Sequence, residues 1–488
     1  MQIAVIGSGF SSLAAATTLS ASGHTVYILE KNEQTGGRAR RFFAQGYTFD
    51  MGPSWYWMPD VFEKYFERFG KQVSDYYELV RIDPSYRVIF EENRFVDIPA
   101  NYTELRSLFE KLEPGACLNL DAFLAQAKYK YNKGMNDLVH KPSRSLLEFA
   151  DLGLLWGILK MDVFSSMHAH LRKFFKHPDI IKLLEFPVLF LGAIPKNTPA
   201  LYSLMNYADI SLGTWYPKKG MYQIVEAMTA LAKEKGVSMH LNEEVLGFET
   251  NGNQVIGVKT KSRVWPCDAV VAGADYHHVE QSLLKADQRN YTEKYWDSRT
   301  MAPSSLIFYL GVNKKLDRLE HHNLFFDEDF TLHAHEIYTE PKWPSKPLFY
   351  VSVVSKTDPE SAPEGCENVF ILIPVAPALA DEESTREHYY NMVMDRLEKF
   401  VGYAIRPHVE YKRSYAHQDF INDYHAFKGN AYGLANTLMQ TAILKPALKS
   451  KKLKNLYFTG QLTVPGPGVP PSIISGQVVA SELMKDLK

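Results

Sequence analysis

The chain has 488 residues, and its 54 Lys and Arg residues nearly balance its 56 Asp and Glu residues, for a formal net charge of −2. So small a charge creates no long-range field for gathering a polyanion, which argues against a nucleic-acid-binding function. Three cysteines are too few for a disulfide framework or a zinc cluster, and they fit a reducing, cytoplasmic compartment. The chain starts without a basic secretory signal and has no run of about 18 apolar residues, so we expect neither a signal peptide nor a membrane-spanning helix.

The first thirty residues predict a strand, a tight turn, a helix and a second strand. Residues 3–6 are a short apolar run, residues 7–12 form the turn, residues 13–21 are rich in helix formers, and residues 25–29 are β-branched and aromatic. This order is typical of the opening of a βαβ unit.

The turn reads GSGFSSL and lies between a strand and a helix, which is the setting of a dinucleotide-binding fingerprint. Gly7 permits the tight turn, and Gly9 lets the backbone approach a pyrophosphate at the helix N-terminus. Ser12 occupies the third position of the GxGxxG pattern, so its side chain must fit between helix and strand. Glu30 ends the second strand, where it can accept hydrogen bonds from ribose hydroxyls and would repel the 2′-phosphate of NADP. The alternative is an ordinary glycine turn followed by an exposed acid.

A second glycine turn follows this acid. Gly36 and Gly37 allow another close approach of the backbone to a pyrophosphate, and Arg38 can neutralise it through a charge-assisted contact. The triplet resembles the GGR element of a large FAD-binding family that includes amine oxidases and carotenoid desaturases. The resemblance implies FAD rather than NAD as the cofactor.

From about residue 101 to residue 217 the pattern changes to longer helical stretches. Residues 128–182 contain ten Lys or Arg and five Asp or Glu, a local excess of 10 − 5 = +5. Basic, aromatic-rich helices fit docking on an anionic bilayer, where each basic side chain contributes about 1 kcal/mol. The alternative is a helical lobe whose lysines are simply solvated.

Alternating α and β character returns further along the chain. Residues 222–235 predict an amphipathic helix that ends at Gly236, residues 255–261 predict a strand, and residues 304–375 contain several short β-like runs. We expect an α/β (α+β) fold of three interleaved parts: a Rossmann-type FAD-binding domain (1–70, 218–290 and 430–488), a β-sheet substrate domain (71–100 and 291–429) and a helical, membrane-facing lobe (101–217).

The last thirty residues predict a Gly- and Pro-rich loop followed by a helix. The prolines between residues 465 and 471 favour an extended approach, and Ser472 can cap the helix. A helix N-terminus aimed at the N1 and C2 carbonyl of a flavin would stabilise the negative charge of the reduced ring. The alternative is a proline-rich turn before a terminal helix.

Four further segments resemble the bacterial phytoene-desaturase type of carotenoid desaturase, in that family's order. They are YTFDMGPSW (47–55), TWYPKKGMYQIVEAM (214–228), VVAGADYHHV (270–279) and YFTGQLTVPGPGVPPSIISGQVVASEL (457–483). The resemblance covers nearly the whole chain and points to the flavobacterial forms, which include phytoene desaturases and 1-hydroxycarotenoid 3,4-desaturases.

The resemblance implies that residues 52–55 line the flavin, that the backbone of Val245 contacts the adenine, and that Asp275, Gly460 and Gln461 surround the ribityl and phosphate part. The family usually has Asp or Ala in place of Gln461, which leaves the role of this side chain open. Together with the two glycine turns and the terminal loop, the candidate FAD-binding residues are Gly7, Gly9, Phe10, Ser11, Ser12, Glu30, Lys31, Gly37, Arg38, Gly52, Pro53, Ser54, Trp55, Val245, Asp275, Gly460, Gln461, Gly468, Val469 and Ser472.

We therefore expect an FAD-dependent carotenoid desaturase, peripherally associated with the cytoplasmic side of the inner membrane, that acts best on a 1-hydroxycarotenoid of the 1′-hydroxy-γ-carotene type. Desaturation would move a hydride to the flavin and a proton from the adjacent carbon, which asks for alignment more than for a strong base. No catalytic acid or base is assigned. Asp151 and Asp162 could accept the proton, but they are more typical of ordinary charges on a helix face. The electron acceptor is not predicted.

Three other functions stay open: a phytoene desaturase, another enzyme of the flavin fold such as an amine or protoporphyrinogen oxidase, and a non-enzymatic prenyl-lipid-binding protein. Trp55, Tyr56 and Trp57 could form part of the aromatic cage of an amine oxidase. No metal site is expected, because only His333 and His335 could share one face of a strand, and two ligands do not make a site.

Overall fold

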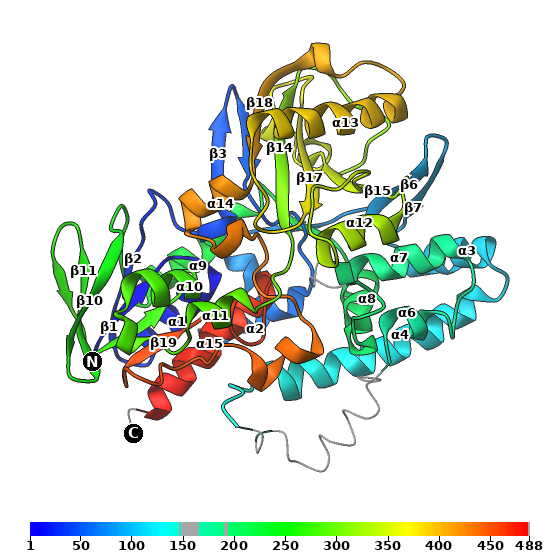
Figure 1. Ribbon diagram of the computed structural model, residues 1–488. Coiled ribbons are helices and arrows are strands. Elements are labelled where there is room, and N and C mark those ends of the chain that lie inside the picture. The colour runs from blue at the N-terminus through cyan, green and yellow to red at the C-terminus, as the bar shows by residue number, and fades with distance from the viewer. Residues whose placement is uncertain (146–147, 149–164, 190–193, 487–488) are drawn as a thin grey trace.

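The computed structural model describes residues 1–145, 148, 165–189 and 194–486 (Figure 1). Its first sheet has five parallel strands in the order β19-β13-β1-β2-β9. The strands are β1 (Gln2–Ile6), β2 (Thr25–Leu29), β9 (Ser238–His240), β13 (Ala269–Ala272) and β19 (Leu456–Phe458). The predicted βαβ opening is confirmed, since α1 (Phe10–Ala21) connects β1 to its parallel neighbour β2. Both ends of the chain thus contribute to one sheet.

Two helices on this sheet pack unusually closely. In Figure 1, α1 lies beside the terminal helix α15 (Val469–Asp486). A Cβ on Gly476 of α15 would lie only 2.1 Å from the backbone oxygen of Ser11, so the glycine sets the distance between the helices. The predicted helix at residues 222–235 is also confirmed, as α9 (Tyr222–Glu234).

The second sheet has seven strands in the order β18-β14-β17-β16-β15-β6-β7, and all neighbours are antiparallel except β15 and β6. The strands are β6 (Tyr86–Glu91), β7 (Arg94–Ile98), β14 (Ser304–Val312), β15 (His322–Phe325), β16 (Phe349–Ser352), β17 (Glu367–Val375) and β18 (Val409–Tyr415). The predicted β runs between residues 304 and 375 are therefore confirmed.

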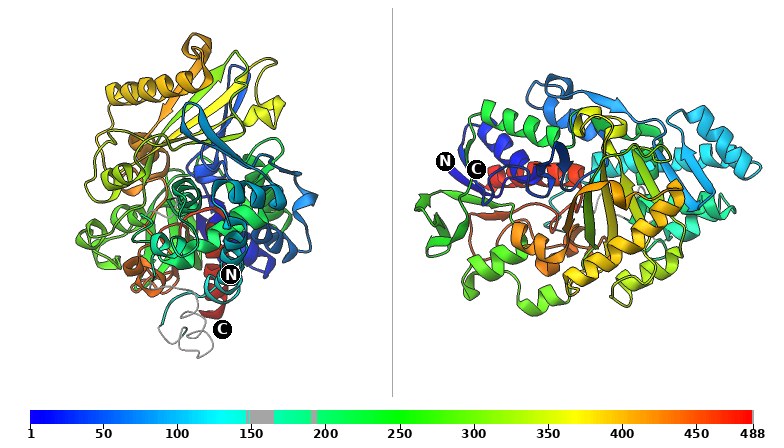
Figure 2. Two further views of the ribbon diagram at one scale, coloured as in Figure 1. Left: turned by 90° about the vertical axis from the view of Figure 1, so that its right-hand side faces the viewer. Right: turned by 90° about the horizontal axis from the view of Figure 1, so that it is seen from above.

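The two faces of β14 serve different purposes, because successive side chains of a strand point to opposite faces. Leu306, Phe308 and Leu310 share a core with α13 (Glu383–Val401), which covers the outer face of the sheet. Ile307 and Tyr309 belong to the large core shared with the first sheet. The second sheet therefore presents one face toward the FAD-binding half predicted from the sequence (Figure 2).

A hairpin links the two halves. Its strands, β3 (Arg41–Ala44) and β4 (Tyr47–Asp50), lie within the range predicted for the FAD-binding domain. The ring of Phe42 nevertheless packs edge-on against Tyr309 of β14, with 5.1 Å between centroids. The predicted domain boundaries stay a prediction, although each sheet takes its strands from the ranges expected for it.

The remaining elements are shorter or lie at the edges. The predicted strand at 255–261 is confirmed as β11 (Gln254–Thr260), which pairs with β10 (Val245–Asn251) and β12 (Val264–Pro266). Other elements are the helices α2 (Pro59–Glu67), α10 (Tyr276–His278), α12 (Phe330–Tyr338) and α14 (His417–Tyr424), and the turns η13 (Leu438–Gln440) and η14 (Ala442–Leu444).

The helical lobe forms the end of the molecule opposite the first sheet (Figures 1 and 2). Its helices include α3 (Tyr102–Leu112), α4 (Ala116–Lys133), α6 (Met167–Leu171), α7 (Pro178–Leu189) and α8 (Leu204–Asn206). Within the part of the chain that the structure describes, no helix is long and apolar enough to cross a membrane. Asp151 and Asp162 lie outside the described residues.

Several of the lobe's basic side chains are not freely solvated. Lys130 is buried, Lys133 pairs with Asp137, and Arg172 pairs with Glu185. The local charge excess read from the sequence is therefore a weaker argument for docking on an anionic membrane than the count alone suggests.

Candidate cofactor site

A cavity of about 430 Å³ lies between the two sheets, which is the size range of ligand-binding pockets. All but one of the residues predicted to bind FAD line it. They are Gly7, Gly9, Phe10, Ser11, Glu30, Lys31, Gly37, Arg38, Gly52, Pro53, Ser54, Trp55, Val245, Asp275, Gly460, Gln461, Gly468, Val469 and Ser472.

The exception, Ser12, packs between helix and strand instead. Its Oγ is 3.5 Å from the backbone oxygen of Ile6, and a Cβ on Gly273 would lie only 2.0 Å from that Oγ. The fingerprint's third glycine normally provides close helix–strand packing. Here Gly273, directly after the neighbouring strand β13, supplies the space that the side chain of Ser12 needs.

The two glycine turns touch each other. Gly7 has φ +83° and Gly37 has φ +56°, so both adopt left-handed conformations that favour glycine. A Cβ on Gly37 would lie 3.3 Å from the Cα of Gly9. No side chain caps α1, so its first amides remain available to an anion in the cavity.

Glu30 is held firmly at the edge of this anion site. Its Oε2 accepts hydrogen bonds from the backbone N and the Oγ of Ser8, at 2.8 and 2.6 Å, and its Oε1 accepts from the N of Asn32 at 2.9 Å. A carboxylate has about four acceptor positions. One acceptor position therefore remains, and the sequence predicts that a ribose hydroxyl donates to it.

Within the described part of the chain, Arg38 is a buried guanidinium with a free N–H donor, as expected of a residue that binds phosphate. Burial lowers the pKa of its guanidinium, and the charge of nearby Asp275 opposes that effect. With the side-chain amide of Gln461 turned so that its oxygen faces Arg38, the Nη2 of Arg38 donates to that oxygen at 3.0 Å. Gln461 would then orient the guanidinium, a role that the family resemblance left open. The Nε of Arg38 is buried and has no partner among the described residues. An anionic diphosphate would satisfy it, so the residues present fit FAD.

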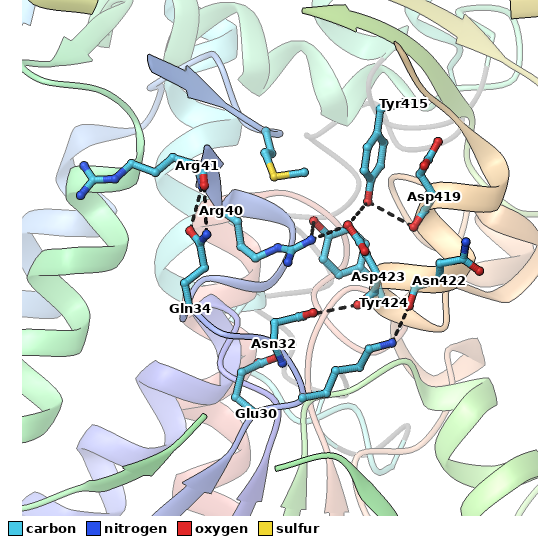
Figure 3. A network of polar contacts seen from close by, with 12 residues as sticks. Glu30, Asn32, Gln34, Arg40, Arg41, Tyr415, Asp419, Asn422, Asp423 and Tyr424 are labelled. Atoms are coloured by element: carbon cyan, nitrogen blue, oxygen red, sulfur yellow. Dashed lines mark hydrogen bonds and ion pairs between the residues drawn. The ribbon is translucent and has the colours of Figure 1, made fainter. Parts of the chain in front are cut away.

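Helix α14 follows β18 of the second sheet and forms part of the cavity wall, with Asp423 and Tyr424 facing Arg40 (Figure 3). Arg40 forms an ion pair with Asp423, which also accepts from the hydroxyl of Tyr415 at 2.9 Å. Lys31, predicted to contact the cofactor, donates its Nζ to the backbone oxygen of Asn422 at 2.5 Å. Sequence reasoning missed this segment, from which Tyr415, Phe420, Asp423, Tyr424 and His425 line the cavity. It contains no glycine pattern that would have marked it.

The predicted flavin loop packs tightly on the GGR turn. A Cβ on Gly52 would lie 2.3 Å from the backbone oxygen of Arg38, so glycine is required there. Further along the loop, Trp55 stacks on the imidazole of His322 with 4.0 Å between ring centroids. The loop therefore connects the cofactor half to the second sheet.

The prediction that Ser472 caps the terminal helix is wrong. Helix α15 begins at Val469, and the backbone N of Ser472 donates to the oxygen of Gly468 at 3.0 Å, so Ser472 lies inside the first turn. Pro470 and Pro471 are helical rather than extended, because proline is tolerated in the first turn, where its missing N–H is not needed. The helix end still lines the cavity, as predicted.

The cavity wall also has polar atoms from the second sheet and from the loops beside it. Ser305, Tyr350 and Tyr432 line the cavity, and the Oγ of Ser305 and the Nε1 of Trp55 are buried without a hydrogen-bond partner among the described residues. Burial raises the pKa of Tyr432 to about 12 and nearby Ser305 lowers it, although their geometry makes no hydrogen bond. The hydroxyl of Tyr350 lies 2.6 Å from the Nδ1 of His322.

The histidine pair weighed as metal ligands lies on α12 and not on a strand. His333 is buried, and its two ring nitrogens contact the oxygen of Pro374 and the N of Leu348. Among the residues that the structure describes, no three His, Cys, Asp or Glu side chains are placed to hold a metal ion.

Comparison with known proteins agrees with this geometry. Residues 10–484 match the family described as flavin containing amine oxidoreductase. A carotenoid 3,4-desaturase of Haloarcula japonica is 38% identical over 486 residues, which cover 99% of this chain and 98% of that protein. A zeta-carotene-forming phytoene desaturase of Myxococcus xanthus is 30% identical over 492 residues, covering 99% and 94%.

A solved structure extends the likeness to the fold. An oxidoreductase from Methanosarcina mazei superposes with a TM-score of 0.65 at 17% identity, over 99% of this chain and 100% of that one. The chain belongs to the flavin containing amine oxidoreductase family, as an FAD-binding member that groups with the carotenoid desaturases.

Proposed function

We propose that the protein is an FAD-dependent desaturase that introduces a C=C bond into the acyclic end of a carotenoid, with a 1-hydroxycarotenoid as its preferred substrate and the 3,4 bond as its target. The observation that carries the proposal is the cavity itself. Cofactor-binding turns from both ends of the chain meet the inner face of the second sheet there, in a chain that resembles carotenoid desaturases over its full length.

Bound FAD would supply the hydride acceptor for one carbon of the substrate; the neighbouring carbon would release its proton to bulk solvent, and the electrons of that second C–H bond would form the new double bond. Turnover would also need an electron acceptor, such as oxygen or a quinone, to reoxidise the cofactor. The protein's part is to hold the reacting C–H bond in line with the cofactor between apolar walls. Apolar side chains on both sides of the cavity supply the walls, including Trp57, Met205, Ile307 and Leu372.

The preference for a hydroxylated end rests on the polar atoms of the second sheet. A buried hydroxyl or indole N–H without a partner costs free energy, which a hydroxyl on the substrate would recover. Ser305 and Trp55 both belong to the cavity wall and each carries such an atom, and the ring of Trp55 lies beside that of Tyr350. A hydrocarbon end would leave them unsatisfied.

Replacing Ser305 by alanine tests this preference. One neutral hydrogen bond contributes about 0.5–1.5 kcal/mol, so kcat/KM for the hydroxylated substrate should fall about three- to tenfold, while conversion of a hydrocarbon such as lycopene stays the same or improves. Ser304→Ala is the matched control, because this neighbour on β14 is equally buried but its Oγ donates to the backbone oxygen of Gly429, and Ser304 does not line the cavity. Equal losses with both substrates would contradict hydroxyl recognition.

Access for a lipid-soluble substrate is the second part of the proposal: peripheral docking on the cytoplasmic side of the inner membrane. Met439 is 74% exposed on η13, and Ile443 and Leu444 are 36% and 43% exposed on η14. This segment lies against the lobe: burial raises the pKa of Tyr202, and Thr441 is close enough to lower it. Tyr202 lies three residues before Met205 of the cavity wall. An exposed apolar cluster beside the substrate cavity supports entry from a membrane.

Vesicle flotation tests the docking surface. Replacing Met439, Ile443 and Leu444 together by serine should reduce binding to vesicles of phosphatidylglycerol and phosphatidylethanolamine several-fold. The control replaces Leu246, Ile256 and Val264, which are 55%, 44% and 43% exposed on the small β10-β11-β12 sheet. If both triple variants bind like the unchanged protein, or lose binding equally, membrane docking through η13 and η14 is wrong.

The alternative functions differ in the carotenoid that is converted or in the compound that reduces the flavin. A phytoene desaturase would convert phytoene and leave the hydroxylated carotenoid unchanged. An amine oxidase would have its flavin reduced by an amine, and a protoporphyrinogen oxidase by protoporphyrinogen. A prenyl-lipid-binding protein would bind carotenoid without reducing the flavin. Expression of the protein in cells that make each carotenoid, followed by chromatography of the pigments, separates the two desaturases. Anaerobic bleaching of the flavin absorbance separates the other two outcomes.

A further inference from the structure

Lys445 is a buried amine that the proposed reaction does not use. Its residue is 5% exposed, and its Nζ donates to the Oδ1 of Asn436 at 2.9 Å. Burial is the one influence on its pKa, which it lowers to about 7, so no acid of the described residues offsets its charge. A buried ammonium without a counter-charge is costly, and an anion placed beside it offsets part of that cost.

The terminal loop brings this amine next to the cavity. Gly466 has φ +141°, and a Cβ at this position would lie 2.9 Å from the Nζ of Lys445 and 3.1 Å from the Oδ1 of Asn436. The glycine therefore leaves room for the amine to reach the loop backbone. The next residues of the loop, from Pro467 to Ser472, line the cavity.

The helix that follows has few backbone N–H donors at its N-terminus, the end that lines the cavity. An α-helix normally presents about four free N–H groups at its N-terminus, and these stabilise an anion. In α15, Pro470 and Pro471 occupy the second and third positions and have no N–H. The helix dipole remains, but fewer hydrogen bonds are available from this end.

We propose that the Lys445 ammonium supplies the missing positive charge and stabilises the anionic, reduced form of the bound flavin. It is a positioning and electrostatic residue, because it acts across the terminal loop and does not line the cavity. A negative charge brought to the cavity wall beside it favours the ammonium form of the amine in return. The proposal concerns the cofactor and is independent of which substrate the cavity accepts.

The test is the reduction potential of bound FAD, measured by equilibration with a reference dye under anaerobic conditions. Lys445→Met removes the charge and keeps the length of the side chain. We expect the equilibrium between oxidised and reduced flavin to shift about tenfold toward the oxidised form, which for a two-electron couple is about 30 mV. Sulfite, which gives a negatively charged flavin adduct, should bind about tenfold more weakly.

A second variant keeps the test decisive if the first fails to retain FAD. Asn436→Asp places a carboxylate beside the ammonium and neutralises it without leaving the amine unpaired, so the potential should fall in the same direction. Lys449→Met is the control, because this lysine lies nearby in the sequence but pairs with Asp486. If either Lys445→Met or Asn436→Asp holds FAD at the potential of the unchanged protein, the proposal is overturned.

Discussion

The contact between α1 and α15 provides a sharp test of how the cavity is assembled. Replacing Gly476 by alanine would put a Cβ 2.1 Å from the oxygen of Ser11 and 2.9 Å from the Cβ of Ala14. An ordinary C···O contact is about 3.3–3.6 Å, so the two helices must separate by about 1 Å. Overpacking of this kind costs about 1–3 kcal/mol.

The separation should also weaken FAD binding, because both helices line the cavity. Ser11 lies in the first turn of α1, and residues 469–472 form the first turn of α15. If about 1.4 kcal/mol of the strain falls on the bound state, the Kd for FAD rises about tenfold. Fluorescence titration of the apoprotein with FAD measures this Kd. Differential scanning fluorimetry measures the apparent Tm, which should fall by several degrees.

Gly134→Ala is the matched control. A Cβ on Gly134 would be 3.6 Å from the side chain of Leu204, an ordinary contact, and the residue has helical φ and ψ. This change should be neutral or should stabilise by about 0.4–1 kcal/mol. If Gly476→Ala matches the control in both Tm and Kd, the close helix contact does not hold the cavity together.

Three further predictions follow from single side chains. Glu30→Gln should weaken FAD binding about ten- to a hundredfold, because it removes the charge from an acceptor that Ser8 and Asn32 already hold in place, whereas exposed Glu33→Gln should leave the Kd unchanged. Asp209→Asn should change how stability depends on pH. Burial raises the pKa of this carboxyl to about 6, so the folded protein binds its proton more tightly than the unfolded chain does, and the wild-type free energy of unfolding falls as pH rises from about 4 to about 6. Relative to wild type, Asp209→Asn should therefore gain on the order of 2 kcal/mol across this window in urea titrations, and an unchanged difference would contradict the burial effect. Asp423→Asn should reduce the apparent Tm and FAD retention together, because it removes the charge on α14 that partners Arg40; loss of neither would mean that α14 keeps its place in the cavity wall without this pair.

The parts of the site that were predictable from sequence are those whose chemistry lies within one short stretch. Gly7, Gly9 and Glu30 predict a phosphate-binding turn and an acceptor for the ribose because a single βαβ unit contains all three. The same holds for the Gly36–Arg38 turn. The long resemblance then added residues 52–55 and the terminal loop, which chain position alone does not connect to that unit.

The parts that were missed depend on contacts between distant elements. Ser305 and Tyr350 face the cavity only because the second sheet turns one side toward it, and a buried strand shows no alternation that marks the inner face. Helix α14 lines the cavity without any motif. For α12 a signal was present: Asp329 accepts from the N of Thr331 and of Leu332, a helix cap that the alternating His-Ala-His pattern concealed.

Anaerobic titration of the purified, FAD-loaded protein tests the proposed function most directly. A carotenoid with a 1-hydroxylated acyclic end, delivered in detergent micelles, should bleach the visible absorbance of the flavin and yield a product with one additional double bond. A flavin that stays oxidised with every carotenoid, but is bleached by an amine or by protoporphyrinogen, would contradict carotenoid desaturation.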